Sequence, residues 1–261
     1  MTLDYEKEFS VFFQQAADLA GSIALAYFRK NIPVDDKHDK TPVTQADRDI
    51  ELKIRAFIEN AFPNHGFIGE EYGKNNPDAE FVWVIDPIDG TKSFATGRPL
   101  FGTIIGLLHG GKPVMGLIEQ AFTKERWLGI DNKAAYHNGT PIHVASPRAF
   151  EQARLYTGSL SMFDDDHLSN WIKMCRTAKW TQYSSDCYGY GLLAMGWADV
   201  VVEQCLGLYD IAGVAPLITG AGGFISDWDG HEIDLNFNGK AVAASCRALA
   251  FESLESFRPP R

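Results

Sequence analysis

The sequence predicts an α/β protein, with an α+β first half and an α/β second half. Two stretches of helical periodicity come first, over residues 5–30 and from Thr44 onward. From residue 81 the apolar residues form short runs, rich in β-branched and aromatic side chains and separated by glycine and proline. Such runs are typical of strands. After residue 146 strand-like and helix-like runs alternate, which is the pattern of the α/β class.

The two helices of the first half are predicted by the spacing of their apolar residues. Between residues 5 and 30 these residues recur every three or four positions, and the pattern ends before Pro33. The polar stretch VDDKHDKTPV, residues 34–43, favours a loop or a weak hairpin. A second helix is expected to begin at Thr44. Its predicted buried residues are Ile50, Ile54, Phe57 and Ile58.

The predicted strands are short and bounded by turn residues. Those of the first half are FVWVI, FGTIIGLL, PVMGLIEQA and ERWLGI, which begin at residues 81, 101, 113 and 125. In the second half ARLYTG and DVVVEQ indicate strands, and three segments indicate helices: 164–178, 188–197 and 210–221. The change of pattern at SPRAF predicts one half over residues 1–145 and another over residues 146–261.

Composition limits the classes of partner. The chain has 34 acidic and 24 basic residues, a net charge of −10, and no cluster of lysine or arginine, which argues against nucleic acid or an anionic membrane as a partner. No apolar run reaches the length needed to span a membrane, and the acidic, polar N-terminus does not resemble a secretory signal. Four scattered cysteines suit a reducing compartment. We therefore expect a cytoplasmic protein.

Two aspartates stand together at the end of an apolar run in WVIDPIDGTKSF, residues 83–94. A carboxylate such as Asp86 at the end of a buried strand loses its hydration at high cost unless a positive charge meets it. Pro87 cannot continue a sheet ladder, so the chain is expected to turn there and bring Asp86, Asp89 and the Ile88 carbonyl together. Oxygen donors of this kind are the ligands that Mg²⁺ prefers. A capped turn is the simpler alternative for the same spacing.

Gly90 and Thr91 follow this acidic pair and begin a new segment. The free backbone N–H groups at such a start can face an anion. Metal ligands and N–H groups side by side would together suit a phosphate monoester.

Three further acidic positions have both a structural and a functional interpretation. Asp47 lies three residues after Thr44 and could complete a capping box. Glu70 and Glu71 in FIGEE could be a solvated loop pair, and Asp210 at a helix start is favoured by the helix dipole alone. None of these residues points to a metal site by itself.

Taken together, these motifs resemble the inositol monophosphatase family along nearly the whole chain. The matching segments are PVTQAD (42–47), FIGEE (67–71), WVIDPIDGTKSFATGRPLFGTIIGLL (83–108), GLIEQ (116–120) and YDIAGVAPLITGAGG (209–223). The resemblance implies a layered αβαβα sandwich, usually dimeric, with the site between the two halves. A homodimer is therefore expected.

The resemblance also implies a role for each matching residue. Two or three Mg²⁺ ions would be held by Glu70, Asp86, the Ile88 carbonyl, Asp89 and Asp210. Gly90 and Thr91 would bind the phosphate, and Asp47 with Thr91 would orient and deprotonate a metal-bound water. Direct in-line attack by that water would hydrolyse the ester without a covalent phospho-enzyme.

The segment SSDCYGYGLLAMGWADVVVE, residues 184–203, resembles the histidinol-phosphate phosphatases of this family. Asp186 and Glu203 would then receive the amine or imidazole of histidinol phosphate. The structural alternatives are a helix cap for Asp186 and a surface position for Glu203. Ser184-Ser185 replaces the Gly-Gly expected in that branch, so other substrates stay open. These are an inositol or sugar phosphate and a nucleotide 3′-phosphate, and an inactive phosphate-binding regulator is the alternative of a different class.

Overall fold

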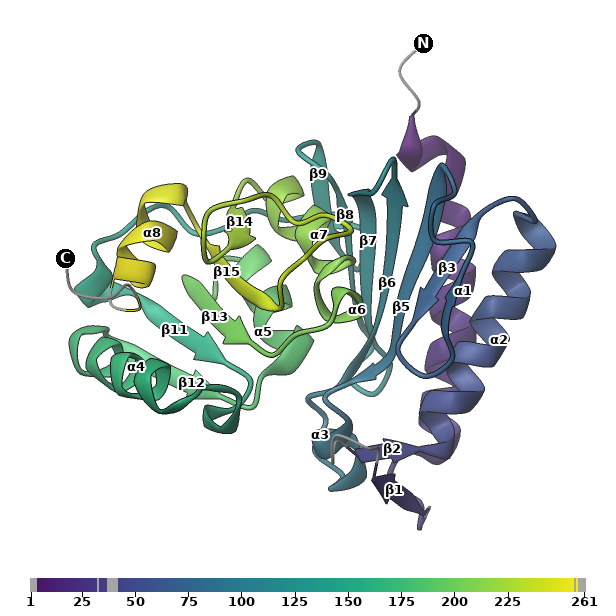
Figure 1. Cartoon of the computed structure of the whole chain (residues 1–261), viewed down its shortest axis with the longest axis horizontal. Helices are drawn as coiled ribbons and strands as arrows, with labels where there is room; N and C mark the ends of the chain where they lie inside the picture. The colour runs from purple at the N-terminus through teal and green to yellow at the C-terminus, as the bar shows by residue number, and fades with distance from the viewer. Residues whose placement is uncertain (1–3, 32, 37–41, 256, 258–261) are drawn as a thin grey trace.

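Helices and two sheets alternate in five layers (Figure 1). The computed structural model describes residues 4–31, 33–36, 42–255 and 257. The outer layers are α1 (Tyr5–Tyr27) with α2 (Gln45–Ala61) on one side and α4 (Asp165–Thr177) with α8 (Arg247–Glu255) on the other. The predicted α/β class and the layered αβαβα sandwich are confirmed.

The larger sheet has eight strands among the described residues, in the order β10-β9-β8-β7-β6-β5-β3-β4. It is antiparallel except between β3 and β5. The strands are β3 (Gly66–Gly69), β4 (Gly73–Asn75), β5 (Phe81–Asp89), β6 (Gly102–His109), β7 (Lys112–Gln120), β8 (Glu125–Ile130), β9 (Ala134–His137) and β10 (Thr140–Pro141). The four strands predicted in the first half are β5 to β8.

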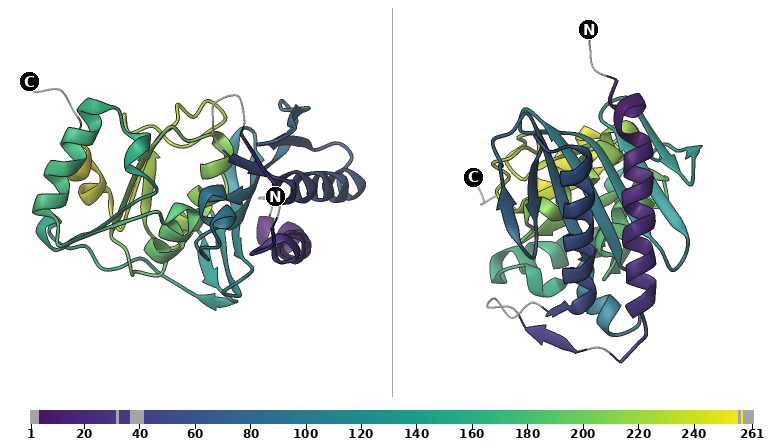
Figure 2. Two further views of the ribbon diagram at one scale, coloured as in Figure 1. Left: turned by 90° about the horizontal axis from the view of Figure 1, so that it is seen from below. Right: turned by 90° about the vertical axis from the view of Figure 1, so that its right-hand side faces the viewer.

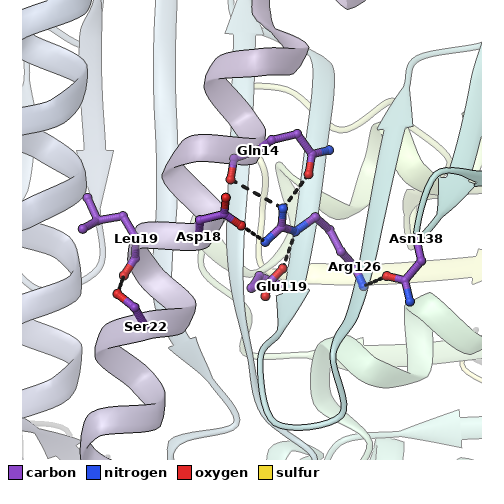
Figure 3. A network of polar contacts seen from close by, with 7 residues as sticks. All are labelled: Gln14, Asp18, Leu19, Ser22, Glu119, Arg126 and Asn138. Carbon is purple, nitrogen blue, oxygen red and sulfur yellow. Dashed lines mark hydrogen bonds and ion pairs between the residues drawn. The ribbon is translucent and has the colours of Figure 1, made fainter.

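Helices α1 and α2 lie side by side over one face of this sheet (Figure 2). The apolar face of α1 explains the contact, because Phe9, Phe12 and Phe13 all pack against Trp83 of β5. Arg126 of β8 also ties α1 to the sheet through Gln14, Asp18 and Glu119 (Figure 3).

Three short helices fill the layer between the sheets: α5 (Asp186–Ala194), α6 (Leu208–Ile211) and α7 (Val214–Gly220). Helix α7 lies directly on β7 and β8 because two glycines allow it. A Cβ at Gly116 would stand 1.9 Å from the Gly213 carbonyl oxygen, and one at Gly129 would stand 2.1 Å from the Leu217 Cα. The larger sheet and the helices of the C-terminal half are thereby packed against each other.

The smaller sheet has the order β12-β11-β13-β15-β14. Its strands are β11 (Arg154–Thr157), β12 (Trp180–Tyr183), β13 (Val200–Gln204), β14 (Phe224–Asp227) and β15 (Lys240–Ala244). Strands β11, β12 and β13 run parallel, and β14 and β15 complete the sheet antiparallel. Buried residues of α4 and α8, among them Trp171 and Leu249, pack on its outer face.

The weak hairpin exists, since β1 (Val34–Asp36) pairs with β2 (Pro42–Thr44), and residues 37–41 between them lie outside the described residues. The single helix expected over residues 210–221 is wrong, because the structure has α6 and α7 instead. Pro216 lacks the N–H that would bond to the Ala212 carbonyl, a lack that is tolerated only in the first turn of a helix, and α7 accordingly begins two residues earlier, at Val214.

Candidate active site

The acidic pair of the motif lies at a bulge near the end of β5. Asp86 pairs with Ile104 of β6 and Asp89 pairs with Gly102, so β5 has one residue more than its partner between these points. The expectation that the strand ends at Pro87 is therefore wrong, since β5 continues to Asp89. A bulge accommodates the missing proline N–H and re-aims the neighbouring side chains.

Three short pieces of chain converge on this bulge. One oxygen each of Asp86, Asp89 and Asp210 lie within 4.8 Å of one another, and the same holds for Asp47, Glu70 and Glu71. Asp210 comes from α6, Asp47 from the first turn of α2, and the two glutamates from the loop between β3 and β4. The structure thus brings together all the carboxylates proposed as ligands, and adds Glu71.

Two of these carboxylates hold an oxygen that lacks a partner. Asp47 and Asp86 are 1% and 2% exposed, and Oδ1 of each has no hydrogen-bond partner among the described residues. Leaving a buried carboxylate oxygen without a partner is costly, so such atoms call for a ligand. A set of carboxylate oxygens fits a hard divalent cation such as Mg²⁺.

The pKa values of the group are consistent with this fit. Burial first, and then the charge of neighbouring carboxylates, raise the pKa of Asp89 to about 8 and that of Asp210 to about 7. The same two causes raise the pKa of Asp86. Ionised carboxylates at neutral pH therefore need positive charge among them, and a bound cation would supply it.

The two interpretations of Asp47, a helix cap and a functional carboxylate, are compatible because each concerns a different oxygen of the side chain. Its Oδ2 accepts hydrogen bonds from the N–H and the hydroxyl of Thr44, at 2.8 and 2.6 Å, which completes the capping box of α2. Its Oδ1 stays without a partner. Burial raises the pKa of Asp47 to about 6, while the bonds from Thr44 oppose the rise. A carboxylate with such a pKa can take up a proton near neutral pH.

Gly90 and Thr91 follow the bulge and begin the short helix α3 (Thr91–Ala95). Gly90 has a φ of 81°, in the left-handed region that favours glycine, and a Cβ here would lie 2.9 Å from Asp186 Oδ2. The Thr91 hydroxyl donates a hydrogen bond of 3.0 Å to the Ile88 carbonyl. That carbonyl has a second lone pair, so it still fits a ligand role.

Asp186 and Glu203 approach the same site from the second half, and neither has its alternative role. Asp186 is the first residue of α5, has a φ of 44°, and its carboxylate accepts a 3.4 Å hydrogen bond from Ser93 rather than capping the helix. Glu203 is 3% exposed, so it is not a surface residue. Its two oxygens accept hydrogen bonds from the Gly158 N–H at 2.7 Å and the Tyr190 hydroxyl at 2.8 Å.

Two adjoining cavities meet at the carboxylates. The outer one has a volume of about 460 Å³. Motif residues of the first half, among them Asp86 and Gly90 to Ser93, line one wall, and Ser159, Ser161 and Asp186 of the second half line the wall that adjoins it. The inner one, of about 340 Å³, is reached by Glu203 and Tyr190. The outer cavity is large enough for a small phosphate ester.

A model of the inositol monophosphatase family matches residues 5–257. The chain belongs to the inositol monophosphatase family. Members of this family are metal-dependent phosphatases, in agreement with the carboxylate groups described above. None of the helices in the described part of this family member is long and apolar enough to cross a membrane.

Some of the proteins similar to this chain are named histidinol-phosphatase, and others are named inositol monophosphatase. The bifunctional phosphatase IMPL2 of Arabidopsis thaliana is 42% identical over 90% of this chain and 68% of its own length. A histidinol-phosphatase of Chlorobaculum parvum and inositol monophosphatase 3 of Solanum lycopersicum are each 33% identical, over 88% of this chain and 89% of their own. A solved inositol monophosphatase from Zymomonas mobilis is 38% identical, with a TM-score of 0.88 over 97% of this chain and 98% of its own.

Sequence reasoning missed two contributors to the site of this phosphatase family member. Glu71 joins Asp47 and Glu70, although its neighbour alone was assigned as a ligand. The N–H of Cys187 donates a hydrogen bond to Asp89, so the start of α5 also holds the acidic motif in place. The double glutamate of FIGEE was a visible signal for the first, whereas a backbone donor leaves no signal in the sequence.

Proposed function

We propose that this phosphomonoesterase hydrolyses histidinol phosphate to histidinol and phosphate, with Mg²⁺ as its metal. The observation that carries the proposal is a half-buried carboxylate, Asp186, which lines the outer cavity next to the Gly90-Thr91 turn and accepts a hydrogen bond from Ser93. A phosphate held by the motif would leave the rest of the substrate in this cavity, within reach of Asp186. Histidinol carries a protonated amine and an imidazole, and a carboxylate is their natural acceptor.

The proposed ligands of two or three Mg²⁺ ions are Glu70, Asp86, the Ile88 carbonyl, Asp89 and Asp210. Bound Mg²⁺ supplies positive charge to the phosphate oxygens and lowers the pKa of water near it. The N–H groups of Gly90 and Thr91 hold the phosphate, in the role that the family resemblance implies.

Asp47 acts as the proton acceptor. Its free Oδ1 takes a proton from the attacking water as the new oxygen–phosphorus bond forms, and the bond to the alcohol oxygen breaks on the opposite side. The alkoxide of histidinol then takes a proton from solvent. Asp86 and Asp89 are not nucleophiles in this scheme, because their oxygens hold cations.

The relatives support both substrate classes to different degrees. Histidinol-phosphatases from Chlorobaculum parvum, Streptomyces coelicolor and Mycobacterium tuberculosis are 31–33% identical to the chain. Inositol monophosphatases at 33% and 38% identity keep inositol 1-phosphate as the second candidate. Glu203 stays a proposed substrate contact, in addition to the two hydrogen bonds that its oxygens already accept. We also propose a cytoplasmic homodimer, as the family resemblance implies, and the four free cysteines are consistent with a reducing compartment.

A comparison of kcat/KM for histidinol phosphate, inositol 1-phosphate and adenosine 3′,5′-bisphosphate tests the proposal. With Mg²⁺ present, we expect histidinol phosphate to have the highest value, and excess EDTA to abolish hydrolysis of all three. A higher value for inositol 1-phosphate would overturn the substrate assignment and leave the phosphatase. Failure to hydrolyse any ester, an aryl phosphate included, would favour an inactive phosphate-binding regulator.

A further inference from the structure

Glu51 is a buried carboxylate that neither the motif nor the proposed mechanism uses. It lies on α2 one turn after Asp47 and is 0% exposed. Its Oε2 accepts a hydrogen bond of 2.7 Å from the N–H of Glu71, and its Oε1 accepts one of 3.0 Å from the N–H of Tyr72. Both donors belong to the loop that joins β3 to β4 and carries Glu70.

The loop is folded closely around this carboxylate. A Cβ at Gly69, the residue just before Glu70, would lie 2.0 Å from Glu51 Oε1. Only glycine leaves room for the carboxylate at this point. Arg55 also joins the arrangement, because its Nη2 lies 3.5 Å from Glu51 and donates a hydrogen bond of 2.9 Å to the Gly73 carbonyl.

A carboxylate is a costly way to close a hairpin, since it must be taken out of water. What Glu51 contributes in exchange is a fixed position for the loop. Asp47 and Glu51 are four residues apart on one helix, so they lie about 6 Å apart along its axis on the same face. Asp47 therefore belongs to the candidate metal group, while Glu51 holds the loop through hydrogen bonds. Glu70 and Glu71 of this loop complete that group.

We propose that Glu51 is a positioning residue that sets the affinity of the site for divalent cations by fixing the 70–72 loop against Asp47. The inference rests on the metal site of the proposed function. Residues that orient metal ligands without touching the metal typically contribute 10–100-fold to metal affinity. Glu51 is expected to fall in this range.

The test is direct Mn²⁺ binding, measured by electron paramagnetic resonance on the full chain without substrate. Glu51→Gln keeps the size of the side chain but places an amide N–H₂ against the backbone N–H groups of the loop. We expect Mn²⁺ binding to weaken by about 10–100-fold. Turnover at saturating Mn²⁺ should fall by less than about threefold, because no group that touches substrate has changed.

Glu119→Gln is the matched control. Glu119 is another nearly buried carboxylate of the same half, but it bonds to Arg126 on the face of the sheet that α1 covers (Figure 3). Its loss should lower the unfolding temperature and leave Mn²⁺ affinity unchanged. Glu51→Asp is the second test variant, because it keeps the charge but withdraws the oxygens from the loop, and it should also weaken Mn²⁺ binding.

The outcomes separate this inference from the proposed function. If the wild-type chain binds no Mn²⁺, the metal site fails and the role of Glu51 fails with it. If the wild type binds Mn²⁺ and either folded Glu51 variant binds it equally well, Glu51 only closes the hairpin and the inference alone is overturned. Equal weakening by Glu119→Gln would also overturn it, because any loss of stability would then produce the effect.

Discussion

The first-half wall and the second-half wall of the site each hold buried carboxylates, but they satisfy them differently. On the first-half wall, which carries the acidic motif, one oxygen of Asp47 and one of Asp86 have no partner among the described residues. On the second-half wall, both oxygens of Glu203 accept hydrogen bonds from the protein itself. Burial and charge are alike, so the free oxygens distinguish a carboxylate prepared for a ligand from one that holds the fold.

Asp186 is intermediate between the carboxylates that have an oxygen without a partner among the described residues and Glu203, whose oxygens are both hydrogen-bonded. Its only described side-chain hydrogen bond is the 3.4 Å contact from Ser93, and it lines the outer cavity. Burial, followed by the charge of Asp89, raises its pKa to about 7. A cationic group of the substrate would lower this pKa and gain a charge-assisted hydrogen bond.

The largest effect is expected at the centre of the motif wall. Asp89→Asn removes a charge from the proposed metal group, and kcat should fall by at least about 10³-fold, comparable to the loss of a major electrostatic contribution. Steady-state kinetics with saturating Mg²⁺ would measure this, with circular dichroism to confirm folding. Near-wild-type turnover would show that Asp89 is only a bulge residue held by the Cys187 N–H.

The next effect concerns the proton acceptor. Asp47→Asn keeps an oxygen for the Thr44 N–H but removes the basic group, so kcat should fall by about 10²–10⁴-fold. Thr91→Ala should reduce kcat within the same range, and substrate affinity should change much less. If Asp47 only caps α2, the variant would lose roughly 1 kcal/mol or less of unfolding free energy and keep its turnover.

A smaller effect is expected to distinguish Asp186 from Glu203, the two carboxylates of the second-half wall. Asp186→Asn should lower kcat/KM for histidinol phosphate by roughly 10–150-fold, the loss of one charge-assisted hydrogen bond, and leave an aryl phosphate nearly unaffected. Glu203→Gln should in addition lower the free energy of unfolding by about 1–3 kcal/mol, because it disturbs the bonds to Gly158 and Tyr190. A selective loss on histidinol phosphate in Glu203→Gln would support the proposed substrate contact, and a loss of stability alone would remove it.

Much of the fold could be predicted because its local signals agree with its packing. The periodicity of residues 5–30 matches α1, and Thr44 does begin α2. The split between α6 and α7 was missed because an apolar run in a buried layer shows no periodicity that would reveal a break. The bulge at Pro87 was also missed, since only the partner strand decides whether a proline ends a strand or distorts it.

The motif residues of the site were predictable, and their partners were not. The short motifs FIGEE and DPIDGT contain carboxylates that lie close together in the structure. Nothing in the sequence near Glu203 reveals that Gly158 and Tyr190 occupy both its oxygens. Such contacts join residues far apart in the chain, so they become visible only when the fold is known.

The two walls share one property, which predicts how stability depends on pH in the absence of metal. Burial is the first cause of a raised pKa in carboxyl groups of both walls: Asp47 to about 6, Asp186, Glu203 and Asp210 to about 7, and Asp89 to about 8. Their usual values are near 4. Between about pH 4 and 8 the folded chain therefore binds more protons than the unfolded chain, and its stability must fall as pH rises.

In EDTA we expect the unfolding temperature to be higher at pH 5 than at pH 8, because the folded chain must ionise these buried acids as the pH rises. Mg²⁺ binds their ionised form, so adding it should raise the unfolding temperature more at pH 8 than at pH 5 and reduce or reverse the slope. Calorimetry at both pH values, with and without Mg²⁺, measures the effect.

The variants Asp186→Asn and Asp89→Asn test the two walls of the site separately. Both variants should flatten the slope in EDTA, but only Asp89→Asn should also remove the response to Mg²⁺. An unfolding temperature that rises from pH 5 to 8 in EDTA would mean that these carboxyls are already ionised without a cation, and the argument from their burial would fail.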